Sequence, residues 1–131
     1  MHKNKLIVSW VAQIIAATIL AQTLFFKFSG AEESVQLFTK LGAEPIGRYL
    51  AGIMELTTVL LLLIPKTAWL GAISGLATMG GAIVAHLTIL GIESNGDGGI
   101  LFSMAIITAL CCFIIAYIRK SDVLLKFHLF L

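Results

Sequence analysis

The stretch IGRYLAGIMELTTVLLLLIP, residues Ile46–Pro65, decides the fold of this chain. A helix of about 20 residues crosses the hydrocarbon core of a bilayer, which is roughly 30 Å thick. Glu55 lies near the middle of the stretch, where an ionised carboxylate without a partner is destabilising by several kcal/mol. We therefore predict a membrane-spanning helix that turns Glu55 toward other parts of the protein.

One side of this helix carries its polar and small residues. Arg48 precedes Glu55 by seven residues, almost two helical turns, so both side chains point the same way. Ala51, Gly52 and Thr58 share that side, and small residues let a neighbouring helix approach closely. The opposite side is aliphatic, so we expect the polar side to face protein.

Composition excludes a water-soluble globule. Of the 131 residues, 59% are hydrophobic and only 12% are charged, whereas soluble domains have about 25% charged residues. The net charge of +2 is too small to indicate nucleic-acid binding, and no basic patch with aromatic residues is present. The length fits one domain, residues 1–131, in contact with the lipid bilayer.

Three further stretches fit membrane spans. Leu6–Phe26 follows a short basic head, and it is too long and lacks a suitable cleavage site for a signal peptide. Trp69–Leu90 contains Gly71 and Gly75 at a spacing that allows close helix packing. Gly99–Ile118 is the last stretch. We therefore expect an all-α, integral membrane four-helix bundle with spans at residues 6–26, 46–64, 69–90 and 99–118.

The longest connection, residues 28–45, is predicted to contain a short helix. Ser29 and Glu32 fit a capping box, and apolar residues follow at helical spacing over Ala31–Leu41. This helix either lies in the membrane interface or covers the ends of the spans. The C-terminal tail, residues 121–131, is too short to cross and is expected to lie along the membrane surface.

Polar residues also follow one side of the first span: Ser9, Gln13, Thr23 and Lys27, together with the small residue Ala16. Two interpretations remain open. The side chains form hydrogen bonds between helices, or they form the wall of a polar cavity.

Lysine and arginine positions predict the orientation. If the N-terminus is cytoplasmic, six basic residues fall on the inner side and three on the outer side. The positive-inside rule then favours both termini in the cytoplasm. The inner residues are Lys3, Lys5, Lys66, Arg119, Lys120 and Lys126, and the outer ones are Lys27, Lys40 and Arg48.

Four ionisable residues from three spans form the candidate site. Lys27, Arg48 and His86 fall toward the outer end, and Glu55 lies deepest. Ionisable residues inside a membrane are functional candidates. We predict an outward-opening pocket with cations at its mouth, Glu55 at its floor, and His86 hydrogen-bonded to Glu55 or Arg48. The alternatives are that Glu55 only holds helices together, that His86 is structural, and that the cations reach toward the lipid head groups.

Other chemistry finds little support in the sequence. Cys111 and Cys112 are adjacent within an apolar run, which favours packing over a redox or metal role. The loop GIESNGDG, residues 91–98, matches neither a calcium loop nor a phosphate loop, and Asp97 is expected to cap the fourth helix. We assign no catalytic residue, no metal ligand and no certain cofactor.

The chain resembles the DoxX family over about residues 6–118. The motifs are a lysine closing the first span in TLFFKFSG, a G-x-x-E in LAGIMELTTVLLLLIP, and a histidine ending the third in GLATMGGAIVAHL. Many members have glycines where this chain has Thr57 and Thr58. The resemblance implies a small four-helix protein of the bacterial cytoplasmic membrane. Some members are associated with thiosulfate–quinone oxidoreductases or with thiol and superoxide defence complexes, and distant eukaryotic relatives are similar to assembly chaperones.

Three functions follow as hypotheses. The first is a non-catalytic accessory subunit of a membrane redox system, with oxidoreductase partners and a quinone or small anion bound beside Lys27, Arg48, Glu55 and His86. The second is a component of a proton-coupled transporter, which would require a homo-oligomer because one copy has few helices. The third is an assembly or chaperone factor that acts through the small-residue helix faces.

Overall fold

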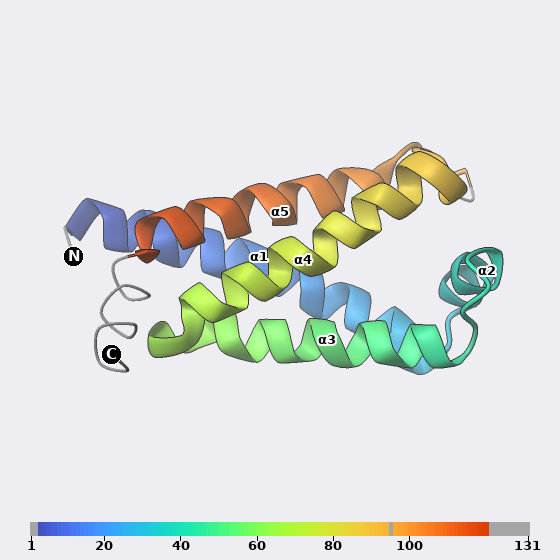
Figure 1. The fold of residues 1–131 in the computed structure, drawn as a ribbon, viewed down its shortest axis with the longest axis horizontal. Coiled ribbons are helices and arrows are strands. Elements are labelled where there is room, and N and C mark those ends of the chain that lie inside the picture. The colour runs from blue at the N-terminus through green and yellow to red at the C-terminus, as the bar shows by residue number, and fades with distance from the viewer. Residues whose placement is uncertain (1–2, 95, 121–131) are drawn as a thin grey trace, which may run out of the picture.

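A computed structural model describes residues 3–94 and 96–120, and all regular structure among them is helical (Figure 1). The elements in chain order are α1 (Lys3–Ser29), α2 (Glu32–Lys40), α3 (Ile46–Leu63), the 3₁₀ turn η1 (Pro65–Thr67), α4 (Ala68–Ala85), the π-helical turn η2 (His86–Leu90) and α5 (Ile100–Ile118). The predicted tail at residues 121–131 lies outside the described residues.

Four helical segments are long and apolar enough to cross a membrane, as predicted. They are α1, α3, the run Pro65–Leu90 and α5. Each also exposes large aliphatic or aromatic side chains on its outer side, which suits contact with lipid. The protein is an all-α, multi-pass membrane bundle.

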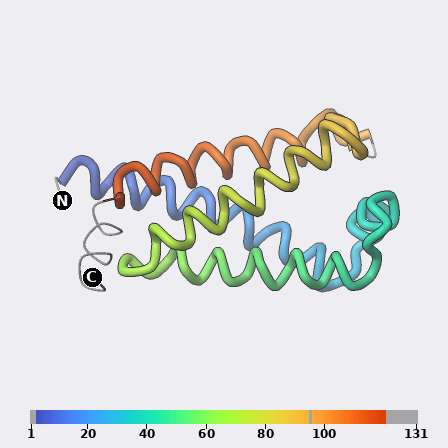
Figure 2. Tube along the Cα trace, viewed as in Figure 1, coloured from blue at the N-terminus to red at the C-terminus, as the bar shows by residue number. Residues whose placement is uncertain are grey.

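The four long helices form two pairs that separate at one end. α1 packs against α3 and α5, and α4 packs against the same two helices. Figures 1 and 2 show that α4 begins beside the end of α3 and rises to lie along α5. The short helix α2 lies at the end of the bundle where α4 has moved away from α3, and we call this end the α2 end.

Close contact between α3, α4 and α5 depends on two glycines of α4. A Cβ added at Gly71 would lie 2.8 Å from the backbone nitrogen of Leu62, and one at Gly75 would lie 2.5 Å from Cys112 Sγ. Beside them, the hydroxyl oxygens of Thr58 and Ser74 lie 2.7 Å apart. The close packing expected from the Gly71–Gly75 spacing is confirmed.

The connection from α1 to α2 differs from the prediction. Ser29 is the last residue of α1, and α2 begins after Ala31 without a side-chain cap, so the predicted capping box is wrong. Gly30 adopts a positive φ of 69°, and the Ala31 amide donates to the Phe26 carbonyl at 3.1 Å. This Schellman-type ending uses the residues that the capping box would need.

A buried polar network ties the helices together at the end opposite α2. Gln13 Nε2 donates to the Leu62 carbonyl at 2.6 Å, which satisfies an acceptor left open where α3 ends. Arg119 Nε donates to Ser9 Oγ at 2.9 Å and to Gln13 Oε1 at 3.1 Å. Arg119 is only 4% exposed, so its guanidinium belongs to this buried network.

Candidate functional site

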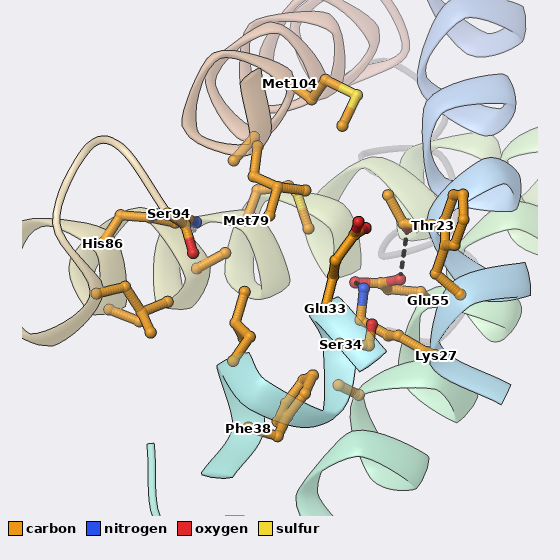
Figure 3. A pocket seen from close by; sticks show the side chains of 18 of the residues that line it. Thr23, Lys27, Glu33, Ser34, Phe38, Glu55, Met79, His86, Ser94 and Met104 are labelled. Atoms are coloured by element: carbon orange, nitrogen blue, oxygen red, sulfur yellow. Dashed lines mark hydrogen bonds and ion pairs between the residues drawn. The ribbon is translucent and has the colours of Figure 1, made fainter. Parts of the chain in front are cut away.

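Glu55 is turned into the protein, as the sequence predicts. Its side chain forms an ion pair with Lys27, with 3.1 Å between Nζ and Oε1. The Thr23 hydroxyl lies 3.0 Å from the other carboxylate oxygen of Glu55 (Figure 3). α1 therefore supplies both partners of the carboxylate, and the expected separation of a cation at the mouth from Glu55 at the floor is wrong for Lys27.

Arg48 belongs to a different cluster. Its Nε lies 3.0 Å and 3.1 Å from the two carboxylate oxygens of Glu44, and its Nη1 donates to the Lys27 carbonyl near the end of α1. A cation at the C-terminus of a helix is stabilised by the helix dipole and by the open carbonyls there. Arg48 does not line the cavity described below, so the structure gives it a role in joining α3 to α1.

A cavity of about 600 Å³ lies at the α2 end, where the helix pairs separate. All five helices, η2 and the loop before α5 contribute to its wall. Most of the wall is apolar, with Leu37, Phe38, Met79 and Met104 among its residues. Its polar side chains are Gln22, Thr23, Lys27, Glu33, Ser34, Glu55, Thr78, His86, Ser94 and Asp97.

His86 lines this cavity but has a partner that the sequence did not predict. Its Nδ1 lies 3.0 Å from the carbonyl oxygen of Gly91, and its ring meets the edge of Phe102 with 5.8 Å between centroids. The side chain is 5% exposed. The predicted hydrogen bond from His86 to Glu55 or Arg48 is wrong, because the π-helical turn brings Gly91 to the imidazole instead.

His86 and Glu55 mark opposite sides of the cavity in Figure 3. Thr58 and Ser74 define a common level of α3 and α4, since their hydroxyl oxygens lie 2.7 Å apart. Glu55 is three residues and His86 twelve residues from that level toward the α2 end. At 1.5 Å per residue, roughly 13 Å along the bundle separates the two residues.

The cavity carries more negative than positive groups. The carboxyl groups of Glu33, Glu55 and Asp97 line it, whereas Lys27 is its only lysine or arginine among the described residues. Glu33 points from α2 into the cavity (Figure 3). Sequence reasoning missed Glu33 and Asp97, since both lie outside the spans and only the position of α2 and the loop brings them here.

Asp97 is held in place by backbone amides, as its predicted capping role requires. It accepts from the amides of Ser94 at 3.1 Å, Gly99 at 2.8 Å and Leu101 at 3.1 Å. Partial burial acts to raise the pKa of this carboxyl group. The three amide bonds and the nearby His86 ring outweigh that effect, so its pKa lies below the ordinary value.

The two cysteines fit the predicted packing role. Cys111 and Cys112 are buried free thiols, and Cys112 packs against Gly75. Within the described part of the chain, no group of three histidine, cysteine, aspartate or glutamate side chains is arranged to hold a metal ion.

Comparison of the chain with protein-family models, with curated proteins and with solved structures gave no match. The resemblance to the DoxX family therefore stays a prediction from the motifs, and the site is interpreted from its own geometry.

Proposed function

We propose that this protein binds a small amphiphilic molecule with a quinone-like head group within the membrane, as a non-catalytic accessory component of a membrane redox system. The observation that carries the proposal is the cluster of Lys27, Glu55 and Thr23 at the wall of an otherwise apolar cavity. A volume of about 600 Å³ falls within the range of small-molecule sites.

The cluster suits both oxidation states of such a ligand. A quinone offers carbonyl oxygens that accept hydrogen bonds, and its reduced form offers hydroxyl groups that donate them. The Lys27 ammonium donates, the Glu55 carboxylate accepts and the Thr23 hydroxyl does either. The cluster can therefore offer a hydrogen-bond partner to an oxygen of the head in either state.

A small anion fits the cavity less well. Lys27 is already paired with Glu55, and Arg48 is paired with Glu44 outside the cavity wall. Glu33 and Asp97 add negative charge to the lining. An anion would meet repulsion from these carboxylates, and no unpaired lysine or arginine among the described lining residues offsets it, so we retain the quinone-like ligand.

Orientation and cellular context complete the proposal. Among the described basic residues, Lys3, Lys5, Lys66 and Lys120 belong to the end opposite α2, which the positive-inside rule assigns to the cytoplasm. The cavity then opens on the outer side of a bacterial cytoplasmic membrane. The redox partner comes from the family resemblance alone.

The alternative functions have weaker support in the geometry. A transporter needs access from both sides, yet the buried bonds among Ser9, Gln13 and Arg119 close the end opposite the cavity. An assembly factor acting through Gly71 and Gly75 would need those faces free, whereas both glycines pack against helices of the same chain.

Binding of decylubiquinone to the purified protein in lipid nanodiscs tests the proposal. Gly81 lines the cavity and Gly80 does not, and a Cβ added at either would meet no atom within 4 Å. We expect Gly81→Leu to weaken binding about tenfold or more by occupying the ligand's space, and Gly80→Leu to leave it unchanged. Both changes favour the helix equally, so stability is matched.

The contribution of the polar cluster is tested in the same assay. Glu55→Gln removes a charged acceptor, and a hydrogen bond to a charged group contributes about 1.5–3 kcal/mol, or roughly tenfold to a hundredfold in affinity. Equal affinity of the wild type, Gly81→Leu and Glu55→Gln would overturn ligand binding. Purification in mild detergent without any oxidoreductase subunit would remove the accessory role.

A further inference from the structure

We infer that His86 forms a second polar subsite in the cavity, and that the ligand is an elongated molecule with polar groups at both ends of an apolar body. The inference rests on the proposed function because it concerns the same cavity. It adds the ligand's shape and the chemistry of its far end, which must supply a hydroxyl or N–H donor.

The bond to Gly91 fixes the tautomer of His86. A backbone carbonyl only accepts hydrogen bonds, so the Nδ1 atom at 3.0 Å from it carries the proton. In a neutral imidazole Nε2 then holds a lone pair and acts as an acceptor. Nε2 has no hydrogen bond with any described residue, although the side chain is 5% exposed and lines the cavity.

The backbone around His86 holds the carbonyl in this position. Gly91 has φ 81° and ψ 163°, a conformation that is essentially restricted to glycine. It directly follows the π-helical turn η2. Such turns are rare in proteins, and those that occur are often found at functional sites. Phe102 packs against the imidazole with its ring at 62°. The ring is therefore fixed in orientation, with a proton on Nδ1 directed at the Gly91 carbonyl.

The distance between the two subsites defines the ligand's shape. Roughly 13 Å along the bundle separates His86 from Glu55, which exceeds the span of one six-membered ring with its two oxygens. Most of the cavity wall is apolar, with Leu37, Met79 and Met104 among its residues. A ligand that contacts both subsites therefore carries an apolar segment between two polar groups.

A purely structural histidine would give a different result. If the bond to Gly91 only fixes the end of the third span, the far end of a ligand gains nothing from Nε2. Affinity would then depend on the group at Glu55 and on apolar contacts. The two interpretations are separated by ligands that differ only in a hydroxyl group at the far end.

The probes are a long-chain alkane diol with terminal hydroxyls and the mono-alcohol of the same length, each bound to the full chain in nanodiscs. We expect the diol to bind about threefold to tenfold more tightly, the contribution of one neutral hydrogen bond. His86→Phe keeps an aromatic ring beside Phe102 but removes Nε2, so the ratio of the two affinities should fall to about one.

Thr88→Val is the matched control. Thr88 also lies in η2, is exposed, and bonds only to the Val84 carbonyl. It should keep the diol preference. A preference that survives His86→Phe would overturn the inference, and so would a preference of equal size in wild type for a diol too short to span the subsites. The short-diol comparison needs no variant, so it decides even if His86→Phe fails to fold.

The outcomes separate this inference from the proposed function. Decylubiquinone binding without any diol preference refutes the His86 subsite and leaves the proposed function standing. A His86-dependent diol preference without decylubiquinone binding refutes the quinone-like ligand and keeps the subsite.

Discussion

Lys27 of α1 and Glu55 of α3 form an ion pair in the interior of the bundle, with 3.1 Å between Nζ and Oε1. The two side chains are only 15% and 6% exposed. A carboxylate near the middle of a span is destabilising unless it is neutralised or paired. This contact explains how Glu55 is accommodated, and it fixes the rotation of α3 relative to α1.

Removing one member of this pair should be more damaging than removing both. Lys27→Met or Glu55→Leu alone leaves a buried charge unpaired, and we expect each to lower the free energy of unfolding by about 3–5 kcal/mol. The double variant leaves no charge and should be markedly more stable than the sum of the two losses predicts. Thermal unfolding followed by a thiol-reactive dye measures this, because Cys111 and Cys112 are buried free thiols. Strictly additive losses would show that the two side chains do not interact.

Gln13 should contribute to stability at the opposite end. Gln13→Leu keeps the volume of the side chain but leaves the Leu62 carbonyl without its 2.6 Å donor, and it removes the Oε1 acceptor of Ser9 and Arg119. We expect a loss of about 1–3 kcal/mol, the desolvation penalty of an unsatisfied buried group.

The control for this prediction is Thr18→Val. Thr18 is an exposed residue of the same helix, and a change there should stay within about 0.5 kcal/mol. Chemical unfolding in detergent measures both variants. Equal stability of Gln13→Leu and Thr18→Val would refute a structural role for the Gln13–Leu62 bond.

Helical periodicity predicted what depends on one helix at a time. Glu55 is buried and shares its side of α3 with Arg48 and Thr58. Arg48 lies seven residues before it, which is nearly two turns, and Thr58 lies three residues after it, which is almost one turn. Gly71 and Gly75 mark the contact with α3 and α5 because only small residues allow that approach.

Features that depend on chain turns were not predictable in this way. His86 meets Gly91 only because a π-helical turn and a glycine with positive φ follow it. Ser29 cannot cap α2 because Gly30 ends α1 one residue later. Arg119 turns inward because Gln13 and Ser9, more than 100 residues earlier, offer it acceptors.

Gly75 should not tolerate even a methyl group. A Cβ at this position would lie 2.5 Å from Cys112 Sγ but 3.7 Å from Cys112 Cβ. We expect Gly75→Ala to lower the free energy of unfolding by about 1–3 kcal/mol through overpacking. Adding Cys112→Ala should recover most of this loss, because only the sulfur atom causes the clash. Thermal unfolding by circular dichroism compares the single and double variants.

Gly80→Ala is the matched control on the same helix. An added Cβ at Gly80 meets no atom within 4 Å, so the better helix propensity of alanine should stabilise the protein by about 0.5–1 kcal/mol. A loss of stability at Gly80 as large as that at Gly75 would indicate a backbone effect, and the packing explanation would fail.

Asp97 should make stability depend on pH in the acidic range. Its folded-state pKa lies below the ordinary 3.8 because its amide bonds and the His86 ring outweigh burial. A lowered pKa means that the stabilisation is complete above the unfolded-state value and is lost as pH falls through the folded-state value. Asp97→Asn should therefore be less stable than the wild type by about 1 kcal/mol near neutral pH, because hydrogen bonds to a charged acceptor contribute more than those to a neutral one. The stabilities of Asp97→Asn and the wild type should converge as the pH falls below about 4.

Circular dichroism melts across this pH range measure the difference in stability between the two proteins. Glu93→Gln is the control, because Glu93 accepts only one loop amide, from Gly98 at 3.3 Å. A wild-type advantage over Asp97→Asn that persists unchanged in acid would contradict the assigned role of the ionised carboxylate.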